Sequence, residues 1–160
     1  MIFAADSGIK FLRETSMNNQ EYFKDGFIIS TDPTQLQIDE VFAFLSQSYW
    51  AKNRSKECVA LSLRHSLCFG LYHKGRQIGL ARVVTDYSTF AHLCDVYVLE
   101  EYRHRNLGKW LIAIVLNHPD LQGIRLWSLL TRDAHGLYRS FGFTELRFPE
   151  RWLEKLDPSK

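Results

Sequence analysis

A loop with two arginines precedes an apolar helical pattern near the middle of the chain. Arg103 and Arg105 stand before Gly108, and the helical pattern begins at Leu107 as LGKWLIAI. The first turn of a helix leaves backbone N–H groups without partners and carries the positive end of the helix dipole. These amides and the two arginines predict an anion site, and the expected ligand group is a phosphate or pyrophosphate.

The spacing excludes two common phosphate-binding loops. A P-loop requires two glycines separated by four residues and then Lys followed by Ser or Thr, whereas Lys109 is followed by Trp110. A dinucleotide-binding fingerprint requires three glycines, and this stretch has one. The anion site therefore belongs to neither class.

The elements that position the loop follow from patterns on either side of it. The apolar run 90–98 predicts a strand that leads into the loop, and Asn117-His118-Pro119 ends the helix that follows. Upstream, Lys74-Gly75 predicts a tight hairpin between strands at 67–72 and 77–85.

Further patterns complete the predicted order of elements. Asp32 is the expected N-cap of a helix with Pro33 at its first position and Gln35 completing a capping box. The other predicted elements are a strand at 26–30, a helix at 55–65, a strand at 124–130, a helix at 133–140 and a strand at 143–148. A helix between two strands allows them to lie parallel in an otherwise antiparallel sheet, so the fold class is α/β of the α+β kind.

Length and composition predict one domain. The chain has 160 residues, 46% of them hydrophobic, which suffices for one core. Residues 1–25 show no period and are expected to form a peripheral N-terminal arm, with the domain at 26–160 and Met17 as an alternative start. The tail at 147–155 is charged and contains a tryptophan.

Charge and cysteine content set limits on partners and location. A net charge of +2 is lower than a nucleic-acid-binding protein usually carries. The three cysteines form no CxxC pair, which argues against a metal site and a disulfide scaffold and favours a reduced, cytoplasmic protein. No apolar run reaches the roughly 18 residues of a membrane span. The first residues are interrupted by Asp6, Lys10, Arg13 and Glu14 and are not expected to form a signal peptide.

Two motifs resemble one enzyme superfamily. Residues 103–108 resemble the coenzyme A signature of the GNAT N-acetyltransferases, Arg/Gln-x-x-Gly-x-Gly/Ala, with Asn106 where glycine is usual. Asparagine tolerates the left-handed backbone better than most residues, so the loop is expected to keep its shape. Residues 134–143 are similar to the family's Ala-x-x-Leu/Phe-Tyr-x-x-x-Gly-Phe, although Thr131 stands where the family commonly has asparagine.

The resemblance spans about residues 26–148 and implies both a fold and an activity. The implied fold is a GNAT-like mixed, mostly antiparallel sheet flanked by helices, with a splayed parallel strand pair at the centre. The implied activity moves an acetyl group from acetyl-CoA, the co-substrate, to a primary amine of a small molecule or amino-acid-like acceptor. Direct attack in a ternary complex is expected, without a metal, a nucleic acid or a membrane. Dimers are common in proteins of this resemblance, and segment 147–155 is a candidate homodimer contact.

The resemblance also implies roles for particular residues. Tyr138 is the expected acid, because a phenol with a pKa of about 10 stays protonated at neutral pH and can protonate a leaving thiolate. A backbone N–H near Tyr97 or Val98 is expected to polarise the thioester carbonyl. The residues expected to bind the coenzyme are Tyr97, Val98, Arg103, His104, Arg105, Asn106, Leu107, Gly108 and Lys109.

Several groups are candidates for the general base. Asp95 is the first candidate, but His92 lies three residues away and strand alternation puts the two on opposite faces. A water chain to Glu100, Glu101 or Asp133 would serve equally well. A cysteine in an apolar strand usually has a raised pKa, which argues against an acyl-cysteine intermediate at Cys94.

The acceptor site and two rival functions are also expectations. Trp50, Arg54 and Thr131 are candidates to bind the acceptor, with Asp86 and Asp95 as further ones; arginine suits a carboxylate and aspartate suits an amine. One rival function is a non-catalytic acyl-coenzyme A sensor or interaction module. The other is a nucleic-acid-binding domain that uses the basic face of 103–109.

Overall fold

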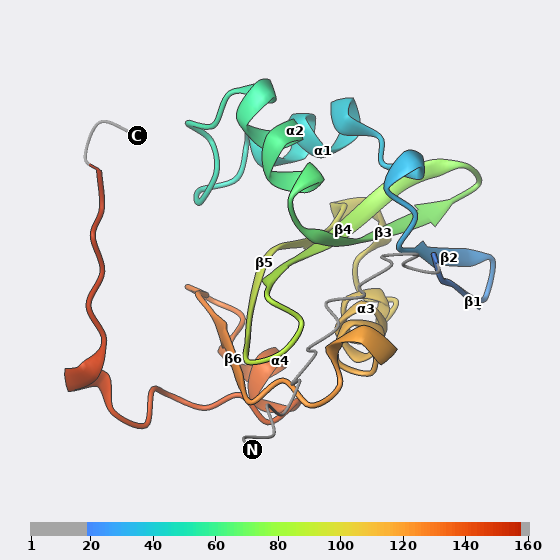
Figure 1. The fold of residues 1–160 in the computed structure, drawn as a ribbon. Coiled ribbons are helices and arrows are strands. Elements are labelled where there is room, and N and C mark those ends of the chain that lie inside the picture. The colour runs from blue at the N-terminus through green and yellow to red at the C-terminus, as the bar shows by residue number, and fades with distance from the viewer. Residues whose placement is uncertain (1–18, 158–160) are drawn as a thin grey trace, which may run out of the picture.

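A single six-stranded sheet carries the fold in the computed structural model, which describes residues 19–157 (Figure 1). The strands follow one another across the sheet in chain order, and every neighbouring pair is antiparallel except the last. The predicted mixed, mostly antiparallel sheet is thus confirmed. The strands are β1 (Glu21–Lys24), β2 (Phe27–Ser30), β3 (Leu67–His73), β4 (Arg76–Thr85), β5 (Phe90–Val98) and β6 (Leu126–Leu129).

Helices cover both faces of the sheet. In Figure 1, α1 (Ile38–Leu45) and α2 (Lys56–Arg64) lie on one side, and α3 (Leu107–Leu116) and α4 (His135–Arg139) lie on the other. Short 3-10 turns stand at Pro33–Gln35, Glu100–Tyr102, Pro119–Leu121 and Pro149–Arg151. Within residues 19–157, no helix is both long enough and apolar enough to cross a membrane.

Several predictions are confirmed where the structure depends on a few neighbouring residues. Lys74 and Gly75 both have positive φ, 49° and 79°, as the predicted hairpin requires. The strand at 90–98 has the predicted bounds, and the helix after the loop begins at Leu107. Ser55 caps α2 by accepting a hydrogen bond from the Cys58 N–H at 3.2 Å.

The boundary of the predicted N-terminal arm at residue 25 is wrong. Residues 21–24 form β1, which pairs with β2 from Glu21 opposite Ser30 onward. Asp25 and Gly26 make a second two-residue hairpin turn, with φ values of 49° and 82°. Residues 1–18, and with them the alternative start at Met17, lie outside the described residues.

The helix expected to begin at Asp32 is divided in two. Asp32 caps only the 3-10 turn, by accepting the Thr34 N–H at 2.9 Å. Gln37 and Gln77 then exchange two hydrogen bonds, each from the backbone N–H of one residue to the side-chain oxygen of the other, at 2.8 and 2.9 Å. This tie to β4 holds the chain out of helical geometry, so α1 begins at Ile38. Gln35 bonds Glu21 instead of closing a capping box.

The strand expected at 143–148 does not form, which corrects the position of the parallel pair. The chain turns at Gly142, with φ of 88°, and the Phe143 N–H donates to the Tyr138 carbonyl at 3.2 Å. An ion pair between Arg139 and Glu145 also holds the segment against α4. The parallel pair β5–β6 therefore lies at the end of the sheet and not at its centre.

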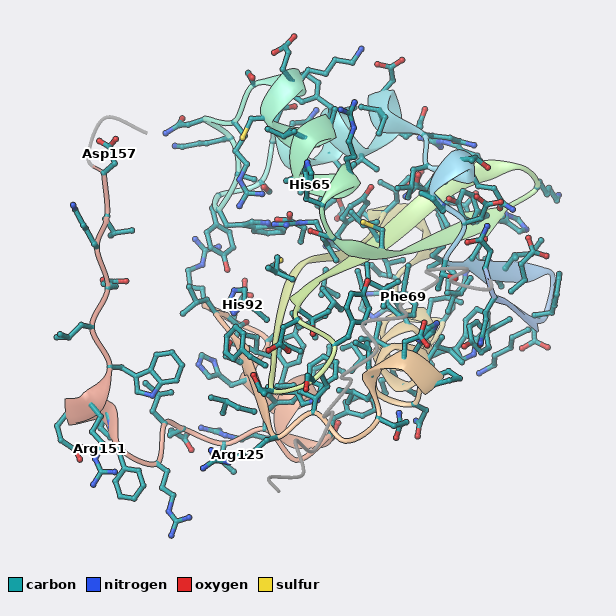
Figure 2. All side chains as sticks on the ribbon, in the orientation of Figure 1. His65, Phe69, His92, Arg125, Arg151 and Asp157 are labelled. Carbon is teal, nitrogen blue, oxygen red and sulfur yellow. The ribbon has the colours of Figure 1, made fainter. Side chains whose placement is uncertain are left out.

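The C-terminal segment runs away from the domain (Figures 1 and 2). Its large apolar side chains are exposed, including Trp152 at 45% and Leu153 at 97%. This segment overlaps the stretch 147–155 offered above as a dimer contact, and that contact stays a prediction.

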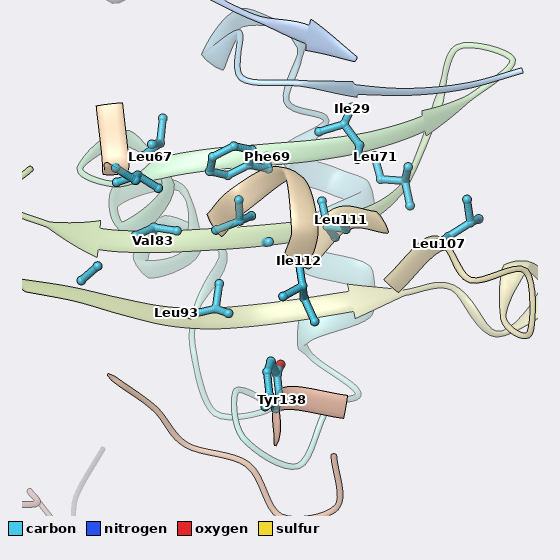
Figure 3. Close-up of a cluster of buried hydrophobic side chains, with 14 of the residues drawn as sticks. Ile29, Leu67, Phe69, Leu71, Val83, Leu93, Leu107, Leu111, Ile112 and Tyr138 are labelled. Carbon is cyan, nitrogen blue, oxygen red and sulfur yellow. The ribbon is translucent and has the colours of Figure 1, made fainter. Parts of the chain in front are cut away.

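Two apolar clusters hold the layers together. Figure 3 shows Leu111 and Ile112 of α3, both fully buried, packed toward the sheet residues Phe69, Val83 and Leu93. Burial of a side chain of this size contributes about 1.5–3 kcal/mol. The second cluster fills the space between the sheet and the helices α1 and α2, and comprises Val41, Leu45, Ala51, Val59, Leu63, Cys68, Leu80 and Tyr97.

The burial of the His118 ring predicts that the fold is less stable in acid. The ring is buried against Phe69, and burial lowers the pKa of His118 although the charge of Asp120 opposes the shift. A pKa below the unfolded value of about 6.5 means that the neutral ring stabilises the fold above that pH, and this contribution is lost as pH falls through the folded-state pKa. We expect the free energy of unfolding to fall between pH 7 and pH 5, and to fall less in His118→Asn.

Urea unfolding across this pH range measures the effect. The Nδ1 atom of His118 accepts the Asp120 N–H at 3.2 Å, and an asparagine oxygen can accept the same bond. His65→Asn, at an exposed position, is the matched control. An equal pH dependence in His118→Asn and the wild type would contradict the prediction.

Candidate active site

The two parallel strands separate halfway along β5. Pairing joins 90–93 to 126–129 and stops there, while β4 continues to pair with β5 as far as Val98. Within the described chain, the β6-facing backbone of 94–98 therefore has no strand partner. A cavity of about 1380 Å³ opens at this point, between the α1–α2 connection, β5, the loop before α3 and the loop before α4.

A β-bulge at Asp95 changes which side chains face this cavity. Asp95 has φ of 50°, and the β4–β5 register shifts there, with Leu80 opposite Tyr97 but Arg82 opposite Cys94. The inserted residue reverses the alternation, so Leu93 and Val96 pack in the same cluster although they are three residues apart. The prediction that His92 and Asp95 point to opposite faces is therefore wrong. Both lie on the α1–α2 side.

The Asp95 carboxylate is the centre of a buried ion cluster. Its side chain is 1% exposed. Arg82 donates from Nε to Oδ2 at 2.7 Å, and Arg54 donates from Nη1 to both oxygens at 2.9 and 3.0 Å. Trp50 donates from Nε1 to Oδ1 at 3.1 Å. These four bonds occupy the lone-pair positions of the carboxylate. Trp50, Arg54 and Asp95 thus meet at the cavity, and their role in binding an acceptor stays a prediction.

The loop before α3 has the shape that the anion-site prediction requires. Asn106 is left-handed, with φ of 59°, and its side chain makes no hydrogen bond to cap the helix. This confirms the expectation that asparagine adopts the conformation usual for glycine. The first N–H groups of α3 consequently remain available for an anion.

The cavity lining includes most of the predicted loop residues. Arg105 and Lys109 are exposed and stand outside the lining, and Arg105 lies over the ring of Tyr102, 5.7 Å from its centroid. Arg103 reaches back to the strand, donating from Nε to the Val98 carbonyl at 3.2 Å. The loop and strand residues predicted for the coenzyme that do line the cavity are Tyr97, Val98, Arg103, His104, Asn106, Leu107 and Gly108.

Gly108 leaves room for a ligand to approach the first turn of α3. A Cβ atom added there would meet no protein atom within 4 Å. The packing of the described residues therefore does not require a glycine at this position. A phosphate-bearing ligand resting on the helix N-terminus would favour glycine at position 108, because the ligand needs close access to the backbone amides.

Tyr138 reaches the cavity from the opposite wall. It is carried by α4 and is buried (Figure 3). Its ring is in edge contact with that of Phe143. Burial raises the pKa of Tyr138 to about 12, and the nearby Tyr49 and Asp133 add to the shift. The phenol therefore stays protonated across the physiological pH range, as an acid requires.

His92 and Cys94, two further titratable groups of the cavity, are neutral at pH 7. Burial lowers the pKa of His92, which is hydrogen-bonded through Nδ1 to the Ser128 hydroxyl at 2.8 Å. Burial also raises the pKa of the Cys94 thiol to about 11. A thiol with this pKa holds little thiolate at neutral pH, which argues against covalent catalysis at Cys94.

Two acceptor-site candidates make local structural contacts instead. Thr131 lines the cavity, and its hydroxyl accepts the Ala134 N–H at 3.0 Å in the loop before α4. Asp86 is outside the lining. Its Oδ1 accepts the N–H groups of Ser88, Thr89 and Phe90, so it shapes the β4–β5 turn.

Three residues of the site have no site role among the sequence predictions. Arg82 is the second cation on Asp95, and its signal is a single charge inside the otherwise apolar strand at 78–84. Phe44 stacks on Tyr97 with ring centroids 3.8 Å apart, and Tyr49 meets Trp50 edge to face at 4.9 Å. These aromatic residues follow a helical period, which also fits ordinary core packing.

The chain is similar to acetyltransferases in both its sequence and its structure. A family model described as "Acetyltransferase (GNAT) domain" matches residues 64–145. A candidate acetyltransferase of Gibberella zeae is 33% identical over 152 residues, covering 80% of this chain and 85% of that protein. The crystal structure of a candidate GNAT acetyltransferase from Xanthomonas campestris has a TM-score of 0.80 at 47% identity, covering 82% of this chain and 94% of that one. A GNAT acetyltransferase from Elizabethkingia anophelis with acetyl-CoA bound shares the fold, with a TM-score of 0.60 at 16% identity, covering 82% and 88%.

Removing the charge of Asp95 is expected to destabilise the protein. Asp95→Asn leaves Arg82, whose side chain is 10% exposed, without its counter-ion. Loss of one partner of a buried pair costs about 3 kcal/mol, so we expect a decrease of that size in the free energy of unfolding. Urea unfolding measures it, with Asp39→Asn as the control because the Asp39–Lys56 pair is exposed. Equal, small effects of both substitutions would show that the cluster does not stabilise the fold.

Proposed function

The chain belongs to the GNAT acetyltransferase family, and from this premise we propose that it transfers the acetyl group of acetyl-CoA to the primary amine of a small-molecule or amino-acid-like acceptor. One observation carries the proposal: the unpaired part of β5, the free first turn of α3 and Tyr138 all face one cavity. The E. anophelis relative with acetyl-CoA bound supports the choice of donor.

The residues present fit the coenzyme at two places. The N–H groups of the first turn of α3, next to the open space at Gly108, suit the pyrophosphate, with Arg103 adding positive charge. The unpaired backbone at 94–98 suits the amide groups of the pantetheine arm, which would pair with it as a strand does. When bound, acetyl-CoA supplies the activated thioester.

Residues of the cavity can assist direct attack in a ternary complex. The acceptor nitrogen forms a bond to the carbonyl carbon, the carbon–sulfur bond breaks, and a backbone N–H near Tyr97 or Val98 stabilises the oxyanion. Tyr138 then protonates the leaving thiolate. Cys94 takes no covalent part, because its thiol is protonated at neutral pH.

We assign Asp95 to positioning and not to proton removal. Four hydrogen bonds occupy its carboxylate, so it has no free lone pair for the amine proton. Glu100 and Asp133 line the cavity and are left as the carboxylates that can take this proton through water. Glu101 lies outside the lining and contacts Arg76.

Tyr138→Phe tests the acid. Loss of a general acid typically costs a hundredfold or more, so we expect turnover with acetyl-CoA and a reactive amine to fall by about that factor. Coenzyme affinity, measured by calorimetry, should stay unchanged because the ring is retained. Tyr22→Phe, far away in β1, is the matched control. Turnover at the wild-type level would remove Tyr138 from the mechanism.

Gly108→Val tests the coenzyme site. The added side chain would fill space that the protein leaves open, so we expect acetyl-CoA affinity to fall at least about tenfold while the melting temperature is retained. Gly136→Val, on α4 and also without close neighbours, is the control. Unchanged affinity in Gly108→Val would place the coenzyme elsewhere.

The same measurements distinguish the non-catalytic alternative. An acyl-coenzyme A sensor would bind acetyl-CoA and lose affinity in Gly108→Val, yet release no free thiol with any amine. Thiol release from a panel of amines and amino acids therefore decides between enzyme and sensor.

A further inference from the structure

Arg54 has hydrogen-bond donors that no described residue uses. Its Nη1 atom holds Asp95, while Nε and Nη2 have no partner among residues 19–157. The side chain is 31% exposed and lines the cavity. An arginine presents its donors as a planar fork that fits a carboxylate with two parallel bonds. Asp95 fixes one branch of this fork, and the other branch is left for a ligand.

The ion cluster also carries an excess of positive charge. Arg54 and Arg82 together bring two cations to the single carboxylate of Asp95. Around them, His92 has a lowered pKa and Cys94 a raised one, so neither adds charge at pH 7. The other acidic residues of the lining, Glu100 and Asp133, come from the β5–α3 and β6–α4 loops and make no ion pair with Arg54. The cluster therefore attracts an anion.

Aromatic rings surround the exposed side of the cluster. Trp50 is 38% exposed and meets both Tyr49 and Phe44, at ring-centroid distances of 4.9 and 6.2 Å. Trp50 also binds Asp95, so the ring and the arginine are held by the same carboxylate. A ligand bound to Arg54 would lie against apolar ring surface.

We propose that the acceptor carries a carboxylate, which binds the free donors of Arg54 while its amine faces the unpaired part of β5. This inference rests on the proposed acetyl transfer and names the class of acceptor: an amino acid or another amine with an acid group, with an apolar body beside Trp50. Asp95 and Trp50 act as positioning residues, because they orient Arg54 and the ring without contacting the acetyl group.

Matched acceptors test the proposal on the unaltered protein. Each amino acid is compared with its decarboxylated amine and its amide, and thiol release from acetyl-CoA gives kcat and KM for each. A charge-assisted bond to arginine predicts that the carboxylate improves kcat/KM by about 10- to 100-fold, mostly through KM. Equal values for the acid and the decarboxylated amine would overturn the inference while leaving acetyl transfer standing.

Arg54→Gln provides the second test. We expect it to raise KM for the carboxylate acceptor by about 10- to 100-fold, and by much less for the decarboxylated amine, so that the preference disappears. Lys52→Gln removes the same charge from the same connection at an exposed position outside the cavity, and should change neither acceptor.

The outcomes separate the inference from the proposed function. Calorimetry with acetyl-CoA confirms that Arg54→Gln is folded and binds the donor. Loss of activity toward both acceptors in Arg54→Gln, with donor binding intact, would contradict a carboxylate-specific role. Absence of thiol release from the wild-type protein with every amine would instead overturn acetyl transfer itself.

Discussion

The buried carboxylate of Asp95 must be neutralised, and the way this is done arranges one side of the site. An ionised group removed from water costs several kcal/mol unless it is paired and hydrogen-bonded. Arg82 supplies one partner from the neighbouring strand, while Arg54 and Trp50 come from the connection between α1 and α2. The connection is therefore tied across the face of β5. Its aromatic residues form a wall of the cavity because the chain has to satisfy this charge.

The opposite end of the cavity depends on a different constraint, the separation of two parallel strands. β6 leaves β5 after Leu93, and the helix that follows β5 begins beside the gap with its first amides free. A phosphate site and an unpaired strand are thus consecutive along the chain. A ligand that used both would place its far end near Asp95 and Tyr138, where the two walls meet.

The sequence predicted features that depend on a few neighbouring residues. The turn at Lys74-Gly75, the left-handed Asn106 and the end of α3 before Pro119 each follow from local backbone preferences. The loop and Tyr138, which come from the two sequence motifs, line the same cavity in the structure. The same kind of turn signal was present at Asp25-Gly26, within the expected arm, and a hairpin forms there.

Features that depend on pairing between distant segments could not be predicted in this way. The bulge at Asp95 is defined by its register against β4, so strand alternation alone put His92 and Asp95 on opposite faces. The break before α1 arises from Gln77, forty residues away. The apolar residues within 143–148 favour a strand, but contacts with α4 direct that segment elsewhere. In each case a partner outside the local window decides the structure.

The unpaired stretch of β5 has a consequence for association with other chains. Exposed sheet edges recruit further strands and lead to aggregation, and proteins usually cover, charge or shorten them. Here the open edge is recessed between β6 and the surrounding loops, and the bulge at Asp95 interrupts its regular hydrogen-bonding repeat. A β-strand of another molecule would collide with β6 and these loops, because it carries side chains on both faces. A narrower ligand with a few amide groups would fit into the recess. The geometry that admits a narrow ligand thus also protects the protein against unwanted strand addition.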